Sequence, residues 1–426
     1  MLVKEIRSDR VNESYYKINH PSGLTIFVYP KVGYTSSYAI LGTKYGSINT
    51  EFQIDGNDVI TVPDGIAHYL EHKLFESEDG DAFARYAETG ASANAYTSFD
   101  KTCYLFSTTE NFKESFEILL DFVQSPYFTK ETVQKEQGII GQEIRMYDDS
   151  PEWRVLFNLL CGMYHNHPVK IDIAGTVESI AEITAEKLYE CYNSFYNLHN
   201  MALCVVGNVN ENEVLEICNK MLKNSESHEI NNIFPDEPYE IVKDYVEQSF
   251  MVGLPLFQLG FKEKAGEKQS DVSEMAQTDI LLAMLASNVS PLYRELMDKN
   301  LINSTFGYEV FEGPLYRSII FSGESRDPKQ VADIIKKYID EVKKSGINSE
   351  DFEIAKKAIY GESVASLNSI ESIANMILDF HFSGREAFCH IEAIANTSAE
   401  MLSERLNSIL DTSNCCLSVI MPSAEE

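Results

Sequence analysis

Two histidines and one glutamate lie within five residues of one another in the stretch Pro63-Asp64-Gly65-Ile66-Ala67-His68-Tyr69-Leu70-Glu71-His72-Lys73-Leu74-Phe75. On an α-helix, His68 and His72 project from the same face, because residues four positions apart are neighbours on the helix surface. Glu71 lies on the same side, three residues after His68. The stretch therefore predicts a helix whose one face can hold a metal ion between two imidazoles, with a carboxylate beside it.

The order of these residues, H-x-x-E-H, matches the inverted form of the zinc protease signature, in which the imidazoles bind zinc and the glutamate is the general base. The same register also arises by chance in unrelated chains, so the motif alone does not decide the function. Catalytic zinc usually takes three protein ligands and leaves one position open. The prediction therefore depends on a third ligand from elsewhere in the chain.

The composition is that of a globular protein with a strongly acidic surface. The 426 residues are too many for one ordinary core and predict two or more domains. Acidic residues number 66 against 35 basic residues, which gives a formal charge of −31. Such a surface repels phosphate backbones and anionic lipids, so we expect neither nucleic acid nor a membrane as a partner. It attracts basic peptides, although acidic surfaces also serve simply for solubility.

The predicted location is cytoplasmic. Residues 1–14 carry charges throughout, and no window approaches the roughly 18 apolar residues of a membrane span. The eight cysteines lie mostly in apolar runs without C-x-x-C spacing, which is typical of reduced core residues and not of zinc ligands.

The two halves of the chain repeat one order of elements. In the first half, hydrophobic patterns predict strands at 24–29, 37–42, 103–107 and 201–207 and helices at 81–88, 116–123 and 130–147. The second half predicts a strand at 318–322, a helix around 335–342, a long helix capped by Ser349 and a strand at 416–420. A shift of about 220 residues lays Thr129 on Ser349 and Gly141 on Gly361. A shift of about 210 lays Phe83 on Tyr293 and Asn94 on Ser304.

This pattern predicts the α+β class, with two homologous domains that each have a largely antiparallel sheet covered by helices. We expect an N-terminal domain over 1–223 that carries the histidine motif, a polar linker over 224–242, and a homologous C-terminal domain over 243–426 without a metal site. A second polar segment, 262–277, predicts a mobile surface loop.

The candidate third ligand lies in the predicted helix 130–147. Glu136 and Glu143 are seven residues apart, two helical turns, so both carboxylates point to one side. Taken alone, each is more typical of an ordinary solvated glutamate.

With these residues the sequence resembles the M16 zinc peptidase family of insulinase, pitrilysin and the mitochondrial processing peptidase. The resemblance covers nearly the whole chain, suits the bacterial two-domain members, and implies the LuxS/MPP-like metallohydrolase fold. It rests on H-x-x-E-H, on the pair Glu136 and Glu143, on Asn94-Ala95-x-Thr97, and on Asn200-x5-Val206-Gly207. It implies that His68, His72 and Glu143 bind one zinc ion per chain. It further implies that Glu71 is the catalytic base and that Glu136 supports the catalytic site.

The resemblance also suggests a substrate site. In the family a peptide adds as an extra strand at a sheet edge near the zinc, and the stretch Ala91–Thr97 looks like that edge. Ala93, Asn94 and Ala95 are the expected substrate-binding residues, because small side chains leave the backbone open to an incoming strand. The alternative is that these alanines simply pack beneath a helix.

Two features depart from the family pattern. The second repeat has Lys356 and Ser363 at the positions of Glu136 and Glu143. Active members often supply an arginine and a tyrosine from the C-terminal domain, and Met297 and Asn303 occupy those positions here. The resemblance therefore implies the zinc-bearing chain of a heterodimer whose M16-like partner supplies arginine and tyrosine, with a homodimer as the alternative.

The function expected from the sequence is a zinc-dependent endopeptidase that cleaves peptides or unfolded segments through zinc-activated water. The alternative is a non-proteolytic structural or assembly subunit that retains the fold. Such subunits tend to lose metal ligands, whereas His68, His72, Glu143 and the base Glu71 are all present. Two imidazoles and one carboxylate favour zinc among the divalent metals.

Overall fold

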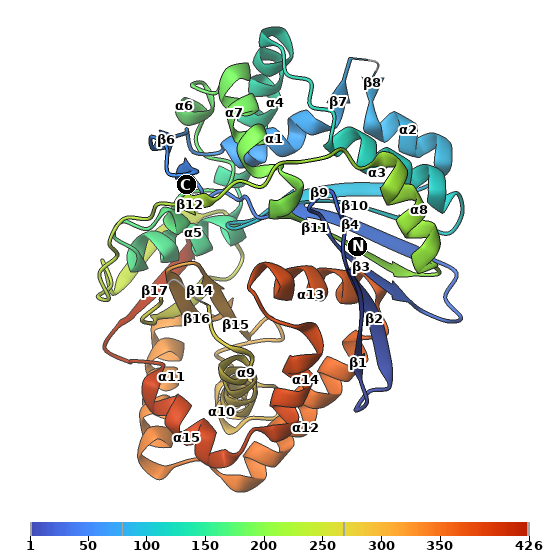
Figure 1. The fold of residues 1–426 in the computed structure, drawn as a ribbon. Helices are drawn as coiled ribbons and strands as arrows, with labels where there is room; N and C mark the ends of the chain where they lie inside the picture. Colours follow the sequence, from blue (N-terminus) through green and yellow to red (C-terminus); the bar gives the residue numbers. More distant parts are fainter. Residues whose placement is uncertain (1, 79, 267–268, 424–426) are drawn as a thin grey trace. The chain divides into compact units, whose positions relative to one another are not determined.

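The computed structural model describes residues 2–78, 80–266 and 269–423 (Figure 1). These residues form two compact units that interleave along the chain. Unit 1 comprises Met1–Ile144, Asp172–Ile233 and Ala365–Phe388, and unit 2 comprises Arg145–Ile171, Phe234–Val364 and Cys389–Glu426. Each unit therefore takes a helical segment from the other half of the chain. The division of the chain into an N-terminal domain over 1–223 and a C-terminal domain over 243–426 stays a prediction.

Unit 1 contains a seven-stranded sheet in the order β1-β2-β3-β11-β4-β10-β9. Its strands are β1 Leu2–Ser8, β2 Glu13–Asn19, β3 Thr25–Pro30, β4 Ser37–Thr43, β9 Ser92–Thr97, β10 Thr102–Thr108 and β11 Met201–Gly207. Neighbouring strands are antiparallel except for the parallel pair β3 and β11. The central strands β4 and β11 are buried along their whole length, as their apolar sequences require. The predictions for β3, β4, β10 and β11 are confirmed.

The strands β1 and β2 were not predicted from the sequence. The first four residues of β1 are exposed, and only Ile6 and Ser8 of this strand are buried. A strand that buries so little has no apolar run to reveal it.

Small sheets and helices complete unit 1. A three-stranded sheet joins β12 Ile230–Asn232, β5 Glu51–Ile54 and β6 Ile60–Thr61, and β7 Glu76–Ser77 pairs with β8 Gly80–Asp81. The helices are α1 Ile66–Leu74, α2 Ala82–Thr89, α3 Phe112–Val123, most of α4 Lys130–Asp148, α6 Val177–Ile180, α7 Ala185–Phe195, α8 Glu211–Met221 and α13 Ile370–Phe382, with a 3-10 turn at Leu198–Asn200. Although α13 comes from the second half of the chain, it packs against β11 and β4.

Unit 2 repeats the same sheet topology with five strands in the order β13-β17-β14-β16-β15. They are β13 Tyr245–Phe250, β14 Leu256–Lys262, β15 Gly307–Gly313, β16 Tyr316–Glu324 and β17 Cys415–Pro422. Here β13 and β17 are the parallel pair, just as β3 and β11 are in unit 1. The predicted fold of two homologous domains with largely antiparallel sheets and helices is therefore confirmed.

The helices of unit 2 follow the repeat as well. They are α5 Pro151–Met163, α9 Val272–Ala286, α10 Pro291–Asp298, α11 Pro328–Ser345, most of α12 Ser349–Ser366, most of α14 Ala387–Asn396 and α15 Ala399–Ser408, with a 3-10 turn at Pro168–Lys170. The helix α5 belongs to the first half of the chain but packs against β13, β14 and β17. Together with α13 it accounts for the interleaving of the two units.

Two local predictions for unit 2 were wrong. The cap of α12 is Asn348 and not Ser349, because Asn348 Oδ1 accepts hydrogen bonds from the backbone N–H groups of Glu350 and Asp351. The polar segment 262–277 is not a loop throughout, since Lys262 ends β14 and α9 begins at Val272. Within this segment, residues 267–268 lie outside the described part of the chain.

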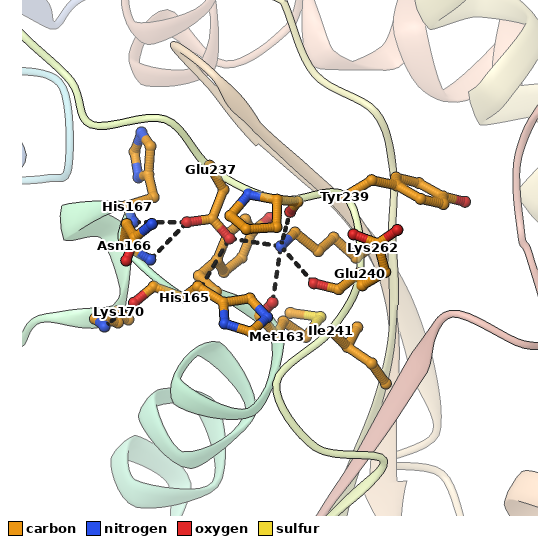
Figure 2. A network of polar contacts seen from close by, with 12 residues as sticks. Met163, His165, Asn166, His167, Lys170, Glu237, Tyr239, Glu240, Ile241 and Lys262 are labelled. Carbon is orange, nitrogen blue, oxygen red and sulfur yellow. Dashed lines mark hydrogen bonds and ion pairs between the residues drawn. The ribbon is translucent and has the colours of Figure 1, made fainter.

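A buried ion pair in unit 2 fixes part of the predicted linker (Figure 2). The Nζ of Lys262 contacts Glu237 Oε1 at 2.6 Å and donates hydrogen bonds to the carbonyls of Met163 and Pro238. The Glu237 carboxylate accepts hydrogen bonds from three backbone N–H groups, those of residues 165–167 in the segment that follows α5. Despite the cost of its burial, the bonds to Lys262 and to these N–H groups lower the pKa of Glu237 to about 2. The polar residues of this segment thus form a specific network.

Replacing Lys262 with methionine is expected to lower the free energy of unfolding by about 3 kcal/mol, because it removes one partner of a buried pair. The Lys262 side chain is only 3% exposed, so water cannot replace it. Urea unfolding followed by circular dichroism measures the change. Lys344→Met, at an exposed position of α11, is the matched control. Equal unfolding midpoints for the two variants would show that the network contributes nothing to stability.

Among the described residues, no helix is both long and apolar enough to cross a membrane. The cytoplasmic location stays a prediction.

Candidate metal centre

The helix α1 positions the H-x-x-E-H residues in the core of unit 1. It begins after Gly65, whose φ of 86° lies in the left-handed region. A Cβ at this position would meet the carbonyl oxygen of Ala174 at 2.3 Å, so the start of the helix requires glycine. Eight of the nine residues of α1 are buried. The surrounding packing therefore holds the helix firmly in place.

The structure brings the predicted metal ligands together. One donor atom from each of His68, His72 and Glu143 lies within 4.8 Å of the others. His68 Nε2 is 3.7 Å from Glu143 Oε1, and His72 Nε2 is 3.3 Å from Glu143 Oε2. Two ligand atoms at about 2.1 Å from a tetrahedral zinc ion lie roughly 3.4 Å apart. These residues therefore fit zinc in both donor chemistry and spacing.

Glu136 lies on the same helix as Glu143, α4, behind the ring of His72 as seen from Glu143. Its Oε1 is 3.1 Å from His72 Nδ1, the ring nitrogen that faces away from Glu143. A carboxylate at this position orients the imidazole so that Nε2 points toward the metal position. His68 has no such partner, because its Nδ1 is buried and makes no hydrogen bond to any described residue.

The electrostatics of the two histidines differ. Burial, together with the nearby His72, lowers the pKa of His68 to about 4, so its imidazole is neutral near pH 7. Burial alone would also lower the pKa of His72. Its hydrogen bonds to Glu136 and Glu143 outweigh burial and raise this pKa to about 10. In the metal-free protein a proton on His72 thus balances the two carboxylates, and a metal ion would have to displace it.

Glu71 is buried beside the ligands and is held by Thr97. Thr97 Oγ1 donates a 2.6 Å hydrogen bond to Glu71 Oε2. Burial raises the pKa of Glu71, which makes this carboxylate a better proton acceptor than an exposed one. Thr97 belongs to the Asn94-Ala95-x-Thr97 motif, which predicted no role for this residue. A threonine in a strand that follows the histidine helix was the one signal for it.

The three predicted substrate-binding residues lie on β9, at the edge of the seven-stranded sheet. Ala93 and Ala95 are half-buried and Asn94 is exposed. On one side β9 pairs with β10, and the edge position leaves its other side available for a further strand.

A cavity of about 590 Å³ opens directly beside these groups. Asn94 and Ala95 of β9 line it together with Glu71, His72 and Glu136. Glu71, His72 and the sheet edge thus face a common space.

The positions that depart from the family pattern lie in unit 2. Met297 is 40% exposed on α10. Asn303 is engaged locally: its Nδ2 donates to Glu324 Oε2 at 2.6 Å, and its Oδ1 accepts the backbone N–H of Thr305. Lys356 donates to the carbonyl of Thr397. Asn303 and Lys356 thus make local contacts within unit 2.

Comparisons with known proteins agree with this geometry. Residues 62–177 match the family model "Insulinase (Peptidase family M16)", and residues 182–359 match "Peptidase M16 inactive domain". The chain is 38% identical over 407 residues to the uncharacterized zinc protease YmfH of Bacillus subtilis, with 94% of each chain covered. It is 25% identical over 358 residues to the zinc protease PqqE of Helicobacter pylori, with 80% of this chain and 79% of that protein covered.

Solved structures give the same result. The crystal structure of an M16-like peptidase from Alicyclobacillus acidocaldarius matches with a TM-score of 0.91 at 33% identity, covering 99% of this chain and 98% of that one. The structure of a protease from Helicobacter pylori matches with a TM-score of 0.82 at 22% identity, covering 99% and 100%, which supports the fold alone.

Proposed function

The chain belongs to peptidase family M16, and we propose on this basis that it is a zinc-dependent endopeptidase acting on peptides or unfolded segments. The observation that carries the proposal is the convergence of His68, His72 and Glu143 at zinc-ligand spacing, with the carboxylate of Glu71 buried beside them. A chain that kept the fold without the chemistry would have no need of this arrangement. The non-proteolytic alternative is therefore the weaker one.

When bound, zinc would supply Lewis acidity toward water and toward the peptide carbonyl. His68, His72 and Glu143 are the residues that would hold it, and Glu136 orients His72. Glu71 takes a proton from the attacking water and delivers it to the leaving amine. Its buried position supports this role, because a carboxylate with a raised pKa accepts the proton more readily.

The substrate lies along β9 as an additional strand. Backbone groups of Ala93, Asn94 and Ala95 pair with it, which explains small side chains at an exposed edge. Recognition through the backbone tolerates many sequences and requires an extended chain. Unfolded segments therefore suit the site better than folded proteins.

A second M16-like chain completes the active site in this proposal. Met297 and Asn303 lie at the positions where family members often carry an arginine and a tyrosine. The side chain of Asn303 is hydrogen-bonded to Glu324 and Thr305. A heterodimer in which the partner supplies both groups accounts for this, and a homodimer is the alternative. The C-terminal repeat over 243–426 carries no metal site in this proposal.

The test is the metal content and peptidase activity of the purified chain. We expect about one zinc per chain by mass spectrometry, and cleavage of a quenched peptide library that stops when a chelator removes the metal. Zinc without cleavage would indicate a missing partner, which co-purification would then seek. A chain that takes up no zinc from excess metal would contradict the proposal.

A further inference from the structure

The strand β9 is held from both faces of its sheet, and one of the two contacts comes from the second half of the chain. As an edge strand, β9 has β10 as its one neighbour in the described sheet. A strand with a single hydrogen-bonded ladder opens locally unless side chains hold it in place. Successive side chains of a strand point to opposite faces of the sheet. Tyr96 and Thr97 therefore hold β9 from different sides.

On the face that carries α1, Thr97 donates its hydrogen bond to Glu71. On the opposite face, the hydroxyl of Tyr96 donates a 3.0 Å hydrogen bond to Oδ1 of Asn375, in α13. The amide of Asn375 is itself oriented, because its Nδ2 donates to the carbonyl of Glu371, one helical turn earlier, at 2.9 Å. The Oδ1 atom of Asn375 is thereby directed at Tyr96.

A second contact lies in the turn between β9 and β10. Lys101 Nζ is 2.6 Å from Asp379 Oδ1, and the Lys101 side chain is 17% exposed against 48% for Asp379. Asn375 and Asp379 are four residues apart and are therefore neighbours on one face of α13. One helix face thus contacts both β9 and the turn that follows it.

The helix α13 is itself fixed on the sheet. Five of its residues are buried, and it packs against β4 and β11. Gly42 of β4 permits a close approach, because a Cβ there would meet Leu378 Cδ2 at 2.8 Å and Phe382 Cε2 at 3.0 Å. Gly42, Cys103 and Tyr96 are cross-strand partners in one row. The row that contains Tyr96 therefore faces a helix that is firmly held.

We propose that Tyr96 and Lys101 are positioning residues for the peptide substrate and that they act through α13. Asn375 and Asp379 hold the backbone N–H and C=O groups of β9 in the alignment that a substrate strand requires. None of these four residues is among the described residues that line the cavity, and none belongs to the metal-ligand cluster. Their effect on the substrate is therefore transmitted by β9. This inference rests on the proposed function, in which the substrate pairs with β9.

The test measures turnover and binding of one unstructured peptide, chosen from a library as the member that zinc-loaded wild type binds most tightly. Tyr96→Phe removes only the hydroxyl group. We expect it to raise KM about fivefold, the effect of one hydrogen bond, with kcat and zinc content at the wild-type level. A variant that is merely less well folded would lower kcat and leave KM unchanged. Asp379→Asn should raise KM about twofold, because water screens this half-exposed pair.

A double-mutant cycle tests whether Tyr96 acts through α13. Asn375→Leu should raise KM as much as Tyr96→Phe, and the double variant should be no worse, because both changes remove the same bond. Tyr192→Phe is the matched control, since it removes a 2.8 Å hydrogen bond from another half-buried tyrosine, to the carbonyl of Val123. It should keep the wild-type KM. An unchanged KM in Tyr96→Phe, or fully additive effects in the cycle, would overturn the inference.

A binding measurement separates this inference from the proposed function. In the zinc-loaded Glu71→Gln background, Tyr96→Phe should raise the Kd of the fluorescently labelled peptide about fivefold. Weaker binding in this variant, together with a wild type that cleaves no peptide, would reject the endopeptidase and keep the positioning role. Cleavage by wild type with the same Kd in both backgrounds, or no binding of any peptide, would reject the positioning role.

Discussion

Replacing Glu71 with glutamine is expected to lower kcat by about a thousandfold while the zinc content stays at the wild-type level. Glutamine has the shape of glutamate but cannot accept the proton of the attacking water, and a positioned general base contributes roughly 10² to 10⁴ in rate. The upper half of that range applies here, because burial has already raised the pKa of Glu71 and no described residue other than Thr97 shares its hydrogen bonds.

The variant should fold normally, because the glutamine carbonyl can accept the same hydrogen bond from Thr97 Oγ1. Metal analysis and single-turnover kinetics on the same preparation measure the two quantities independently. Thr97→Val is the companion variant. It leaves the carboxylate in place without its partner, and we expect a smaller loss of about tenfold. A Glu71→Gln enzyme with wild-type kcat would mean that another group is the base.

Much of unit 1 near the motif was predictable because its elements carry strong periodic patterns. The apolar runs of β4 and β11 are buried along their whole length, and the stripe of α3 gave that helix directly. The proximity of Glu143 to His68 and His72 could not be predicted from periodicity. Periodicity placed Glu136 and Glu143 on one side of a helix, but only the family resemblance distinguished them from surface carboxylates.

The features that escaped prediction depend on long-range contacts. The strand β1 is mostly exposed, so its sequence shows no alternation. Nothing local in α5 or α13 reveals that each packs against the sheet built mainly by the other half of the chain. Similarly, the polar residues of 224–242 suggested a simple linker, whereas Glu237 accepts hydrogen bonds from three backbone N–H groups in the segment after α5 and pairs with Lys262.

Replacing Glu143 with glutamine is expected to lower zinc affinity by at least about a thousandfold, more than the ten- to hundredfold that the loss of a supporting partner costs. The Glu143 carboxylate is the anionic member of the proposed ligand set and faces both imidazoles, at 3.7 Å from His68 Nε2 and 3.3 Å from His72 Nε2. A neutral amide binds zinc poorly and cannot balance its charge.

The decisive comparison is with Glu136→Gln, measured by competition with a chromophoric chelator. Glu136 is hydrogen-bonded to Nδ1 of His72 and does not belong to the three-residue cluster, so its loss disturbs the orientation of one proposed ligand and removes none. We therefore expect Glu136→Gln to weaken zinc binding by ten- to hundredfold and Glu131→Gln, exposed in the first turn of α4, to leave it unchanged. Because all three variants alter one helix by the same chemical step, the order of their affinities tests the assignment directly. Equal losses for Glu136→Gln and Glu143→Gln would mean that both carboxylates act through His72, and that the third ligand lies elsewhere.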